Sequence, residues 1–462
     1  MTFTELRFVV FFLIVFGIHW SLRHGVSRKV FLLASSYFFY GVWDVRFLGL
    51  IAFSTLVDYG IGLGLAQTQA PSARRAWLAL SLTTNLGLLA LFKYYDFFVG
   101  SAVQVLSWAG LETSPHSLKL ILPIGISFYT FQTLSYSIDV YRRQLEPRNF
   151  LNFALFVGFF PQLVAGPIVR AKDFLPQLLE RTSFGAVAVR PAATLILFGF
   201  AKKACVADNV AVWVDTLFAA PDQYGIAMLW LGSVLYFVQI YCDFSGYSDM
   251  AIGVAALLGY TLPLNFAFPI FARSITQFWR RWHISLSSWF RDYLYIPLGG
   301  SRGGRASTYR NLWLVFCLCA LWHGAAWTFV VWGSLHGLIL VLERAFRMSG
   351  RLERNPLGYV WTFLLANFAW VFFRATSISN GADYLAGMFG AGSGEQELRD
   401  LSTIAWFLGT FLVLHLANYV GGLEERFSKL PAPLYAILYG ALFAILLPIV
   451  STEYQPFIYF QF

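Results

Sequence analysis

The sequence predicts an all-α polytopic membrane protein, organised as a single membrane domain over residues 1–462. Apolar side chains make up 58% of the chain, aromatic ones 19% and charged ones only 12%, and the mean hydropathy is +0.62. A water-soluble fold of this composition would expose far more apolar surface than soluble proteins do. Apolar runs recur along the whole chain, which leaves little sequence for a separate soluble domain.

Apolar runs, and the Gly, Pro and charged residues between them, mark the expected membrane helices in order. The first run lacks the basic leader and small-residue cleavage site of a signal peptide, so we expect it to be a span. In all we expect roughly 11–13 membrane-embedded helices, and the run 311–345 is long enough to be broken or doubled. The ranges are 6–20, 30–43, 47–66, 76–92, 119–138, 150–169, 192–218, 225–242, 249–262, 311–345, 357–373, 402–420 and 434–450.

Helix breakers interrupt two of these runs. Pro123 and Gly125 lie within 119–138, and Pro161 lies within 150–169. Such breaks survive at membrane depth where protein or a watery cavity satisfies the freed backbone groups. We therefore expect re-entrant segments around a central channel.

The net charge of +9 comes from 33 Lys and Arg against 24 Asp and Glu. The basic residues are scattered through short connections, so membrane topology and contact with anionic lipid explain the charge better than nucleic-acid binding does. Their alternation along the first connections predicts an N-terminus that faces outward. The segment 273–310 carries seven arginines and one acid, Asp292, so we expect it on the cytoplasmic side.

The cysteines lie in apolar sequence without the spacing of a metal site. We expect packed thiols rather than disulfides, and no bound metal. The four positions are Cys205, Cys242, Cys317 and Cys319.

The segment 278–295, FWRRWHISLSSWFRDYLY, has the periodicity of an amphipathic helix. At 100° per residue one face is aromatic, and the opposite face places His283 on a polar, cationic stripe. Ionisable groups at membrane depth are rare and are usually functional. The alternative is an interfacial helix whose Trp and Tyr only anchor it at the lipid headgroups. The stripe consists of Arg280, His283, Ser287 and Arg291.

A second histidine, His323, lies in the motif LWHGAAW (321–327) between apolar runs. The small residues from Gly324 onward allow a substrate or another helix to approach the imidazole. A neutral imidazole can accept a proton from a hydroxyl or thiol. The alternative is a buried histidine satisfied by a neighbouring helix. His336, also in an apolar stretch, is expected to be a packing residue.

A third cluster, YFVQIYCDFSGYSDMAIG (236–253), places two carboxylates at the expected mouth of an apolar span. Asp243 and Asp249 could bind a polar substrate or a metal. They could also cap helices by accepting backbone N–H groups, and we favour this structural role.

These motifs carry a family resemblance. YCDFSGYSDMAIG, ITQFWRRWHISLSSWFRDYLYIPLGG (275–300), RNLWL (310–314) and LWHGAAWTFVVWGSLHG (321–337) resemble the membrane-bound O-acyltransferase (MBOAT) superfamily, and within it the bacterial AlgI-like polysaccharide O-acetylation group. LPIGISFYTFQTLSYSIDVYR (122–142) and FPQLVAGPIVR (160–170) also fit. The resemblance implies the MBOAT fold, with its core motif region at about 236–345.

The resemblance also implies an activity. His323 would be the catalytic residue and His283 a second functional position, along a channel from a cytoplasmic donor to an outer acceptor. The donor would be acetyl-CoA, with no bound cofactor, and the arginine-rich segment could attract its phosphates. The remaining candidates for donor binding or channel lining are Arg280, Arg281, Trp282, Ser287, Asn265, Trp322, Gly324, Asp243, Ser245 and Tyr247.

By the same resemblance the chain works in the bacterial inner membrane with other proteins of polysaccharide biosynthesis. One of these would be an extracytoplasmic transferase of the SGNH hydrolase kind, and the polymer would be alginate, cellulose or peptidoglycan. A secondary transporter is the competing class, because broken helices and intramembrane histidines suit one equally well. A membrane scaffold is a weaker third option. An experiment with labelled acetyl-CoA separates the three classes. Hydrolysis or transfer of the label that needs His323 indicates an enzyme, passage of the intact labelled molecule indicates a transporter, and the absence of both indicates a scaffold.

Overall fold

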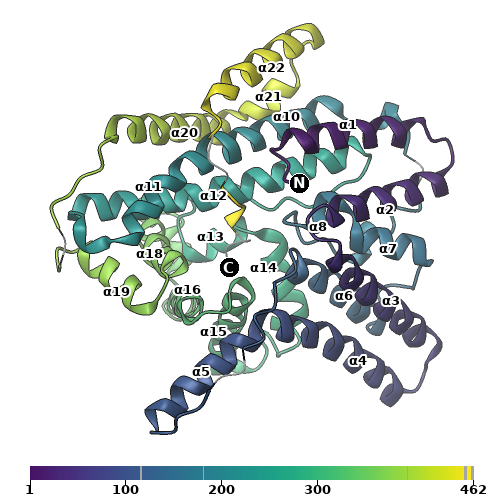
Figure 1. Cartoon of the computed structure of the whole chain (residues 1–462), viewed down its shortest axis with the longest axis horizontal. Helices are drawn as coiled ribbons and strands as arrows, with labels where there is room; N and C mark the ends of the chain where they lie inside the picture. The colour runs from purple at the N-terminus through teal and green to yellow at the C-terminus, as the bar shows by residue number, and fades with distance from the viewer. Residues whose placement is uncertain (115–116, 181, 393, 452–454, 459–462) are drawn as a thin grey trace. The chain divides into compact units, whose positions relative to one another are not determined.

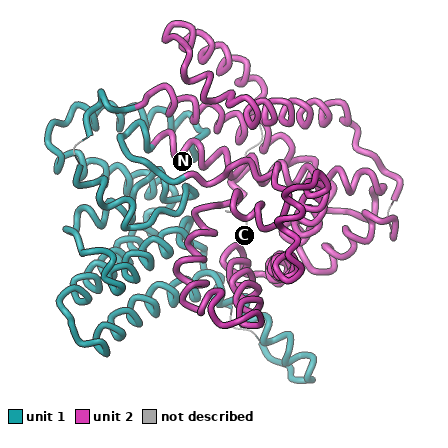
Figure 2. The backbone as a smooth tube through the Cα atoms, turned by 180° about the vertical axis from the view of Figure 1, so that it is seen from behind, with its two compact units in different colours: residues 1–187, 255–263 teal, residues 188–254, 264–462 magenta. Residues whose placement is uncertain are grey.

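The computed structural model describes residues 1–114, 117–180, 182–392, 394–451 and 455–458. Its helices form two compact units, coloured separately in Figure 2: residues 1–187 with 255–263, and residues 188–254 with 264–462. We predicted a single domain over 1–462 and a central channel. Both statements concern how the two units associate, so they stay predictions. The described residues contain no strand, only an isolated parallel bridge between Tyr224 and Gln396.

The first unit is built from helices of its N-terminal half. A buried polar network joins α3, α4 and α6, where Asp58 accepts hydrogen bonds from Ser81 Oγ, Asn85 Nδ2 (2.7 Å) and Ser137 Oγ (2.8 Å). Because a buried carboxylate is costly unless its oxygens are bonded, this network fixes how the three helices pack. The elements are α1 (Leu6–Ser21), α2 (Gly25–Gly41), α3 (Arg46–Gln67), α4 (Pro71–Leu89), η1 (Ala90–Tyr94), α5 (Tyr95–Trp108), α6 (Ile126–Tyr141), α7 (Phe150–Gly158), α8 (Phe160–Leu163), α9 (Ala171–Phe174) and η2 (Phe184–Ala186).

The second unit carries all the candidate site residues. Its longer helices are labelled in Figure 1. The elements are α10 (Val189–Phe200), η3 (Ala201–Ala207), α11 (Asp208–Ala219), η4 (Pro221–Gln223), α12 (Ile226–Leu257, with its last three residues in the first unit), η5 (Pro269–Phe271), α13 (Ile275–Arg281), α14 (Ile284–Phe290), η6 (Arg291–Tyr295), α15 (Gly304–His323), α16 (Trp327–Ala345), α17 (Ser349–Leu352), α18 (Leu357–Arg374), α19 (Ile378–Gly387), α20 (Leu401–Gly421), α21 (Leu423–Ser428), α22 (Ala432–Leu446) and η7 (Leu447–Ile449).

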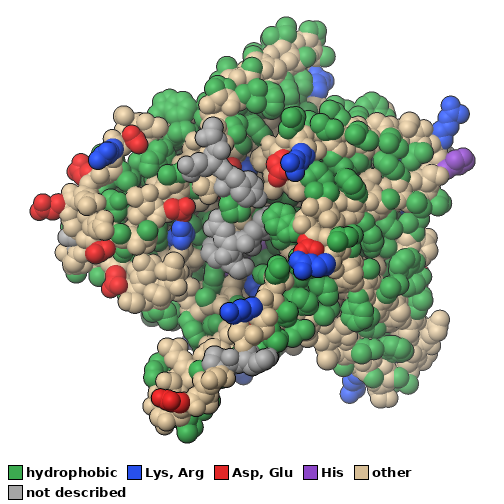
Figure 3. Space-filling model, in the orientation of Figure 1, with side chains coloured by type: hydrophobic (Ala, Val, Ile, Leu, Met, Phe, Trp, Pro, Cys, Tyr) green, Lys and Arg blue, Asp and Glu red, His purple; other side chains and the backbone are tan. Residues whose placement is uncertain are grey.

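Within the described residues, seven helices are long and apolar enough to cross a membrane. Their burial differs in a way that shows which of them face lipid. In α12, 72% of the apolar window is buried inside the protein, against 17% in α20 and 6% in the segment Ala432–Ile449. Apolar side chains are spread over the face seen in Figure 3, and charged ones are few there. The chain is therefore a multi-pass membrane protein whose second unit is organised around α12.

The expected helix breaks are confirmed. Gly125 adopts φ +76° before α6, and a Cβ there would lie 2.6 Å from the carbonyl oxygen of Leu163. Glycine is required here because the backbone is left-handed and a second segment approaches closely. The run 150–169 likewise divides at Phe159 into α7 and the short α8.

The runs 225–242 and 249–262 are not two helices, because the single helix α12 (Ile226–Leu257) crosses the first run and extends through most of the second. The run 311–345 is doubled as expected, into the antiparallel helices α15 and α16, which lie side by side (Figure 1). Gly333 lets them approach, since a Cβ there would lie 2.4 Å from the Ala320 side chain.

Candidate active site

The two histidines singled out from the sequence lie next to each other. The centroids of the His283 and His323 rings are 6.4 Å apart, although 40 positions separate the residues in the sequence. Their exposed fractions are 0% and 3%, so both imidazoles are inside the protein. Two ionisable rings gathered in the interior of a membrane protein mark the first place to look for chemistry.

The backbone at His283 explains how this ring reaches the interior. We expected one helix over 278–295, and this is wrong, because α13 ends at Arg281 and α14 begins at Ile284. His283 lies between them with φ +42° and ψ +55°, a left-handed conformation that L-residues rarely adopt. Main-chain hydrogen bonds hold this break on both sides: Ala267 N donates to Arg281 O, and Ile284 N donates to Asn265 O, each at 2.9 Å.

The break separates His283 from the expected cationic stripe. Arg280 is exposed, whereas Arg281 donates to the carbonyl of Phe271 at 3.2 Å and so supports the loop before α13. Ser287 donates to the Trp282 carbonyl at 3.4 Å. The opposite, aromatic face of the segment is buried as expected, with Phe278, Trp282, Leu286, Trp289 and Tyr293 all less than a tenth exposed.

Asn265 orients the His283 ring. Its Oδ1 accepts a hydrogen bond from the main-chain N of Ser285 (3.3 Å) and from the Ser285 hydroxyl (2.9 Å), while its Nδ2 donates to Ser248 Oγ (3.1 Å). These contacts identify Oδ1 as the acceptor that lies 3.0 Å from His283 Nδ1. His283 must then carry its proton on Nδ1, which leaves the lone pair on Nε2. That atom is buried and has no hydrogen-bond partner among the described residues.

His323 is the last residue of α15 and sits at the tip of the α15–α16 hairpin. The neighbouring Gly324 was expected to admit a substrate or another helix. The space beside it is filled by the Phe329 ring of α16, 2.1 Å from where a Cβ of Gly324 would lie. Trp322 packs against both histidines, with ring centroids 6.0 Å from His283 and 5.0 Å from His323.

Aromatic rings from distant segments complete the surroundings of the two histidines. Trp332 of α16 and Phe373 of α18 lie 5.2 and 5.5 Å from the His323 ring, and Phe244 of α12 lies 4.6 Å from the His283 ring. The sequence did not single these residues out, because nothing in their own segments distinguishes them from ordinary membrane-helix aromatics.

The second unit also contains a group of buried polar atoms, most of them on or next to these rings. His336 accepts a hydrogen bond from Trp279 Nε1 at 3.3 Å through Nδ1, and its Nε2 is among the buried atoms that have no partner in the described part of the chain. Buried polar groups are nearly always hydrogen-bonded, so these atoms are suited to contact a polar substrate. They are Tyr236 Oη, Gln239 Oε1, His283 Nε2, Trp332 Nε1, His336 Nε2 and Trp370 Nε1.

The carboxylates of α12 do not cap helices, because the helix is continuous at both positions. Asp243 pairs with Lys203 at 2.5 Å, and Asp249 pairs with Lys202. Both lysines come from η3, a π-helical segment. The structural role that we favoured is thus an ion-pair role, and the capping part of that expectation is wrong.

Asp243 also accepts a hydrogen bond from the main-chain N of Ile458 at 2.9 Å. The preceding residue, Phe457, packs its ring 5.0 Å from Tyr247 and 5.7 Å from Phe244. Ser245 is fully buried on the same helix. Asp243 and Tyr247, two of the α12 residues that the sequence indicated, therefore hold the segment 455–458 close to Phe244, which packs on the His283 ring.

Glu343 anchors the start of α13, the helix that leads into His283. This fully buried carboxylate accepts hydrogen bonds from Ile275 N (2.8 Å), Thr276 N (2.9 Å) and Trp361 Nε1 (3.1 Å). A carboxylate at a helix N-terminus is stabilised by free N–H groups and by the helix dipole. Glu343 thereby ties α13 to α16 and α18.

The chemistry available here is that of neutral imidazoles. Burial lowers the pKa of His283 well below its usual range, because the ring is removed from water. A neutral ring with a lone pair on Nε2 can accept a proton or a hydrogen bond. Within the described part of the chain, no group of three or more His, Cys, Asp or Glu could hold a metal ion.

Comparison with known proteins decides the family. The model described as MBOAT, membrane-bound O-acyltransferase family, matches residues 32–379. The chain belongs to this family. It is therefore a membrane O-acyltransferase, and this result favours the enzyme over the transporter and the scaffold.

Three relatives show the range of names within the family. The chain is 39% identical to the probable alginate O-acetylase AlgI of Pseudomonas putida, with 100% of both chains covered. It is 38% identical to the peptidoglycan O-acetyltransferase of Helicobacter pylori, over 80% of this chain and 75% of the relative. It is 31% identical to the teichoic acid D-alanyltransferase of Streptococcus thermophilus, over 54% and 64%.

Proposed function

We propose that this MBOAT protein moves acetyl groups from a cytoplasmic donor, acetyl-CoA, across the bacterial inner membrane for O-acetylation of an extracytoplasmic polysaccharide. Alginate, cellulose and peptidoglycan are the candidate polymers. The names of the relatives that cover most of this chain, which refer to alginate and peptidoglycan acetylation, support this class of substrate. A transporter of a small polar or acylated substrate is the alternative.

The observation that carries the proposal is the buried pair of His283 and His323. Ring centroids 6.4 Å apart allow one small group between the rings to contact both. In the proposed step, an imidazole accepts the proton of an acceptor hydroxyl, and the oxygen of that hydroxyl bonds to the thioester carbonyl carbon. The carbon–sulfur bond then breaks, and the leaving thiolate takes up the proton as a thiol. His323 is the proposed base and His283 the residue that orients the reacting groups.

The remaining parts of the proposal concern surroundings and partners. The N-terminus faces outward, and the arginine-rich segment 273–310 lies on the cytoplasmic side. An SGNH-type transferase outside the membrane receives the acetyl group and modifies the polymer, alongside other polysaccharide biosynthesis proteins. No bound cofactor takes part.

The test uses purified protein in vesicles with acetyl-CoA labelled in its acetyl group. Transfer of label to a hydroxyl acceptor, lost in His323→Ala, supports the proposal. Appearance of intact labelled acetyl-CoA inside the vesicles, unchanged in His323→Ala, supports the transporter instead.

A further inference from the structure

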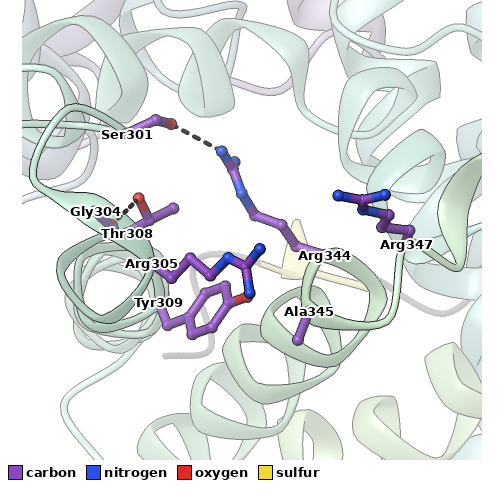
Figure 4. A pocket seen from close by; sticks show the side chains of 8 residues that line it. All are labelled: Ser301, Gly304, Arg305, Thr308, Tyr309, Arg344, Ala345 and Arg347. Atoms are coloured by element: carbon purple, nitrogen blue, oxygen red, sulfur yellow. Dashed lines mark hydrogen bonds between the residues drawn. The ribbon is translucent and has the colours of Figure 1, made fainter.

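A second, polar site lies at the other end of the α15–α16 hairpin. A cavity of about 520 Å³ is bounded by the first residues of α15, the last residues of α16 and the loops beside them. Its lining contains three arginines and no acidic residue (Figure 4). The lining residues are Ser301, Gly304, Arg305, Thr308, Tyr309, Arg344, Ala345 and Arg347.

The three guanidinium groups approach the cavity from different segments. Arg305 extends from α15 and Arg344 from α16, with the Arg344 guanidinium turned toward Ser301, and Arg347 follows the end of α16 (Figure 4). Arg344 donates a hydrogen bond to Ser301 Oγ at 3.1 Å. None of the three arginines forms an ion pair with an acid in the described ranges. Like charges gathered in this way repel one another until an anion lies between them.

Arg347 holds its position at a backbone cost. It has φ +52°, and it occupies the position after α16 where glycine is usual: Met348 N donates to Glu343 O (2.8 Å) and Arg347 N to Arg344 O (3.3 Å). The left-handed conformation disfavours an L-residue with a long side chain. An arginine at this position therefore needs another reason, and its place at the cavity supplies one.

We propose that the arginines of this cavity bind a phosphate ester. Guanidinium groups match the oxygens of a phosphate with paired hydrogen bonds, and the adjacent Ser301 and Tyr309 hydroxyls can add further ones. The dipole at the N-terminus of α15 acts in the same direction. The volume is in the range of small-molecule sites, so the cavity holds more than the phosphate itself.

This site is separate from the histidine pair. Gly304 and His323 are the first and last residues of α15, so about 29 Å of helix lies between the cavity and the imidazole. The phosphate ester is therefore held by its charged end, away from the reacting atoms. Two sources share this chemistry, a soluble ester such as coenzyme A and the headgroup of an anionic phospholipid. For a soluble ester such as coenzyme A the inference rests on the proposed function, because the cavity would hold the phosphates of the acetyl donor. A lipid headgroup would bind here whatever the donor is, and binding is measured apart from acetyl transfer, so failure of one does not imply failure of the other.

The test measures binding of two probes, coenzyme A and phosphatidylglycerol, to the full-length protein in uncharged detergent. The variants are the double substitution Arg305→Gln with Arg344→Gln, and Arg347→Gly. The second removes a charge while giving the left-handed position its preferred residue, so it cannot be mistaken for a folding defect. Arg302→Gln is the matched control, because this arginine lies on the same loop without lining the cavity.

We expect at least one probe to bind the wild type, and both cavity variants to weaken that binding about tenfold or more while Arg302→Gln does not. Weakening for coenzyme A identifies a soluble ester, and weakening for phosphatidylglycerol identifies a lipid headgroup. The inference is overturned if neither probe binds, if the cavity variants bind as the wild type does, or if Arg302→Gln weakens binding equally.

Discussion

His323 is the residue on which the proposed chemistry depends. His323→Ala should abolish acetyl transfer while the protein still inserts, because the side chain lies at a helix end and makes mainly ring contacts there. Polymer acetylation in cells that produce only this variant is the measurement, with the amount of membrane-inserted protein as the control. Acetylation near the wild-type level would remove His323 from the role of base. His283→Ala should also lower activity.

Asn265 should act through His283 rather than on the substrate. Asn265→Leu removes the acceptor that fixes the Nδ1 proton, and we expect kcat to fall about tenfold or more with little change in KM. Asn265→Asp keeps an acceptor and adds a charge, which raises the pKa of His283. Since the neutral ring is the active form, activity of Asn265→Asp should fall at mildly acidic pH where the wild type retains it. Identical pH profiles for the wild type and Asn265→Asp would contradict this role.

Both histidines could be found from the sequence because each stands out within its own segment, and Trp322 accompanies one of them there. The orienting role of Asn265 could not, since it depends on contacts with residues 17 to 20 positions away in the chain. Trp332 and Phe373 were missed for the same reason. Their role arises from the packing of α15 against α16 and α18, which no local pattern contains.

Among the helices, the α15–α16 hairpin presents both functional sites, one at each end. Its close packing leads to a prediction. Gly333→Val would place a side chain against Ala320 and against the carbonyl oxygen of Phe316, which lies 2.6 Å from the position of a Cβ. We expect about 1–3 kcal/mol or more of destabilisation and less protein in the membrane, measured by fluorescence-detected size exclusion.

The control for this substitution is Gly409→Val on α20. Nothing lies within 4 Å of the position of a Cβ at Gly409, so the same change should leave the amount and monodispersity of the protein unaltered. Equal loss from both variants would show that valine is harmful in any of these helices, and the hairpin argument would fail.

The break at His283 shows why periodicity alone predicted the wrong helix boundaries. The aromatic periodicity of 278–295 continues without a gap, and its apolar face is buried as the pattern indicates. The chain breaks because main-chain groups of Asn265 and Ala267 bond to residues on either side of His283. Periodicity indicates which side chains are buried. It carries no information about a neighbouring loop whose backbone competes for the hydrogen bonds of the helix.

For the whole molecule, the distribution of Lys and Arg makes the orientation testable. Single cysteines at Ser301 and Ser307, in a cysteine-free background, should react with a membrane-impermeant thiol reagent only after the cytoplasmic side is opened. Both positions are accessible enough to label, since Ser301 is exposed and Ser307 partly exposed. Labelling of intact cells from outside would reverse the assignment of the segment 273–310.

The division of labour between proteins is a second prediction at this scale. The described residues outside the helices form short connections, none of which could grip a polysaccharide. Deletion of a neighbouring SGNH-type transferase should therefore block polymer acetylation without lowering the amount of this chain in the membrane. Full acetylation of the glycan by this chain alone, reconstituted with acetyl-CoA, would show that no partner is needed.

The left-handed backbone at His283 also has a consequence for mutation and inheritance. The residues that enter this conformation most readily, apart from glycine, are Asn, Asp and His. The codons for Asn and Asp each differ from a histidine codon by a single base, but so do those for Tyr, Leu, Pro, Arg and Gln, which the left-handed backbone disfavours. Among single-base variants at this codon, those carrying Asn or Asp should therefore accumulate as folded protein with altered chemistry, while the others should be recovered less often.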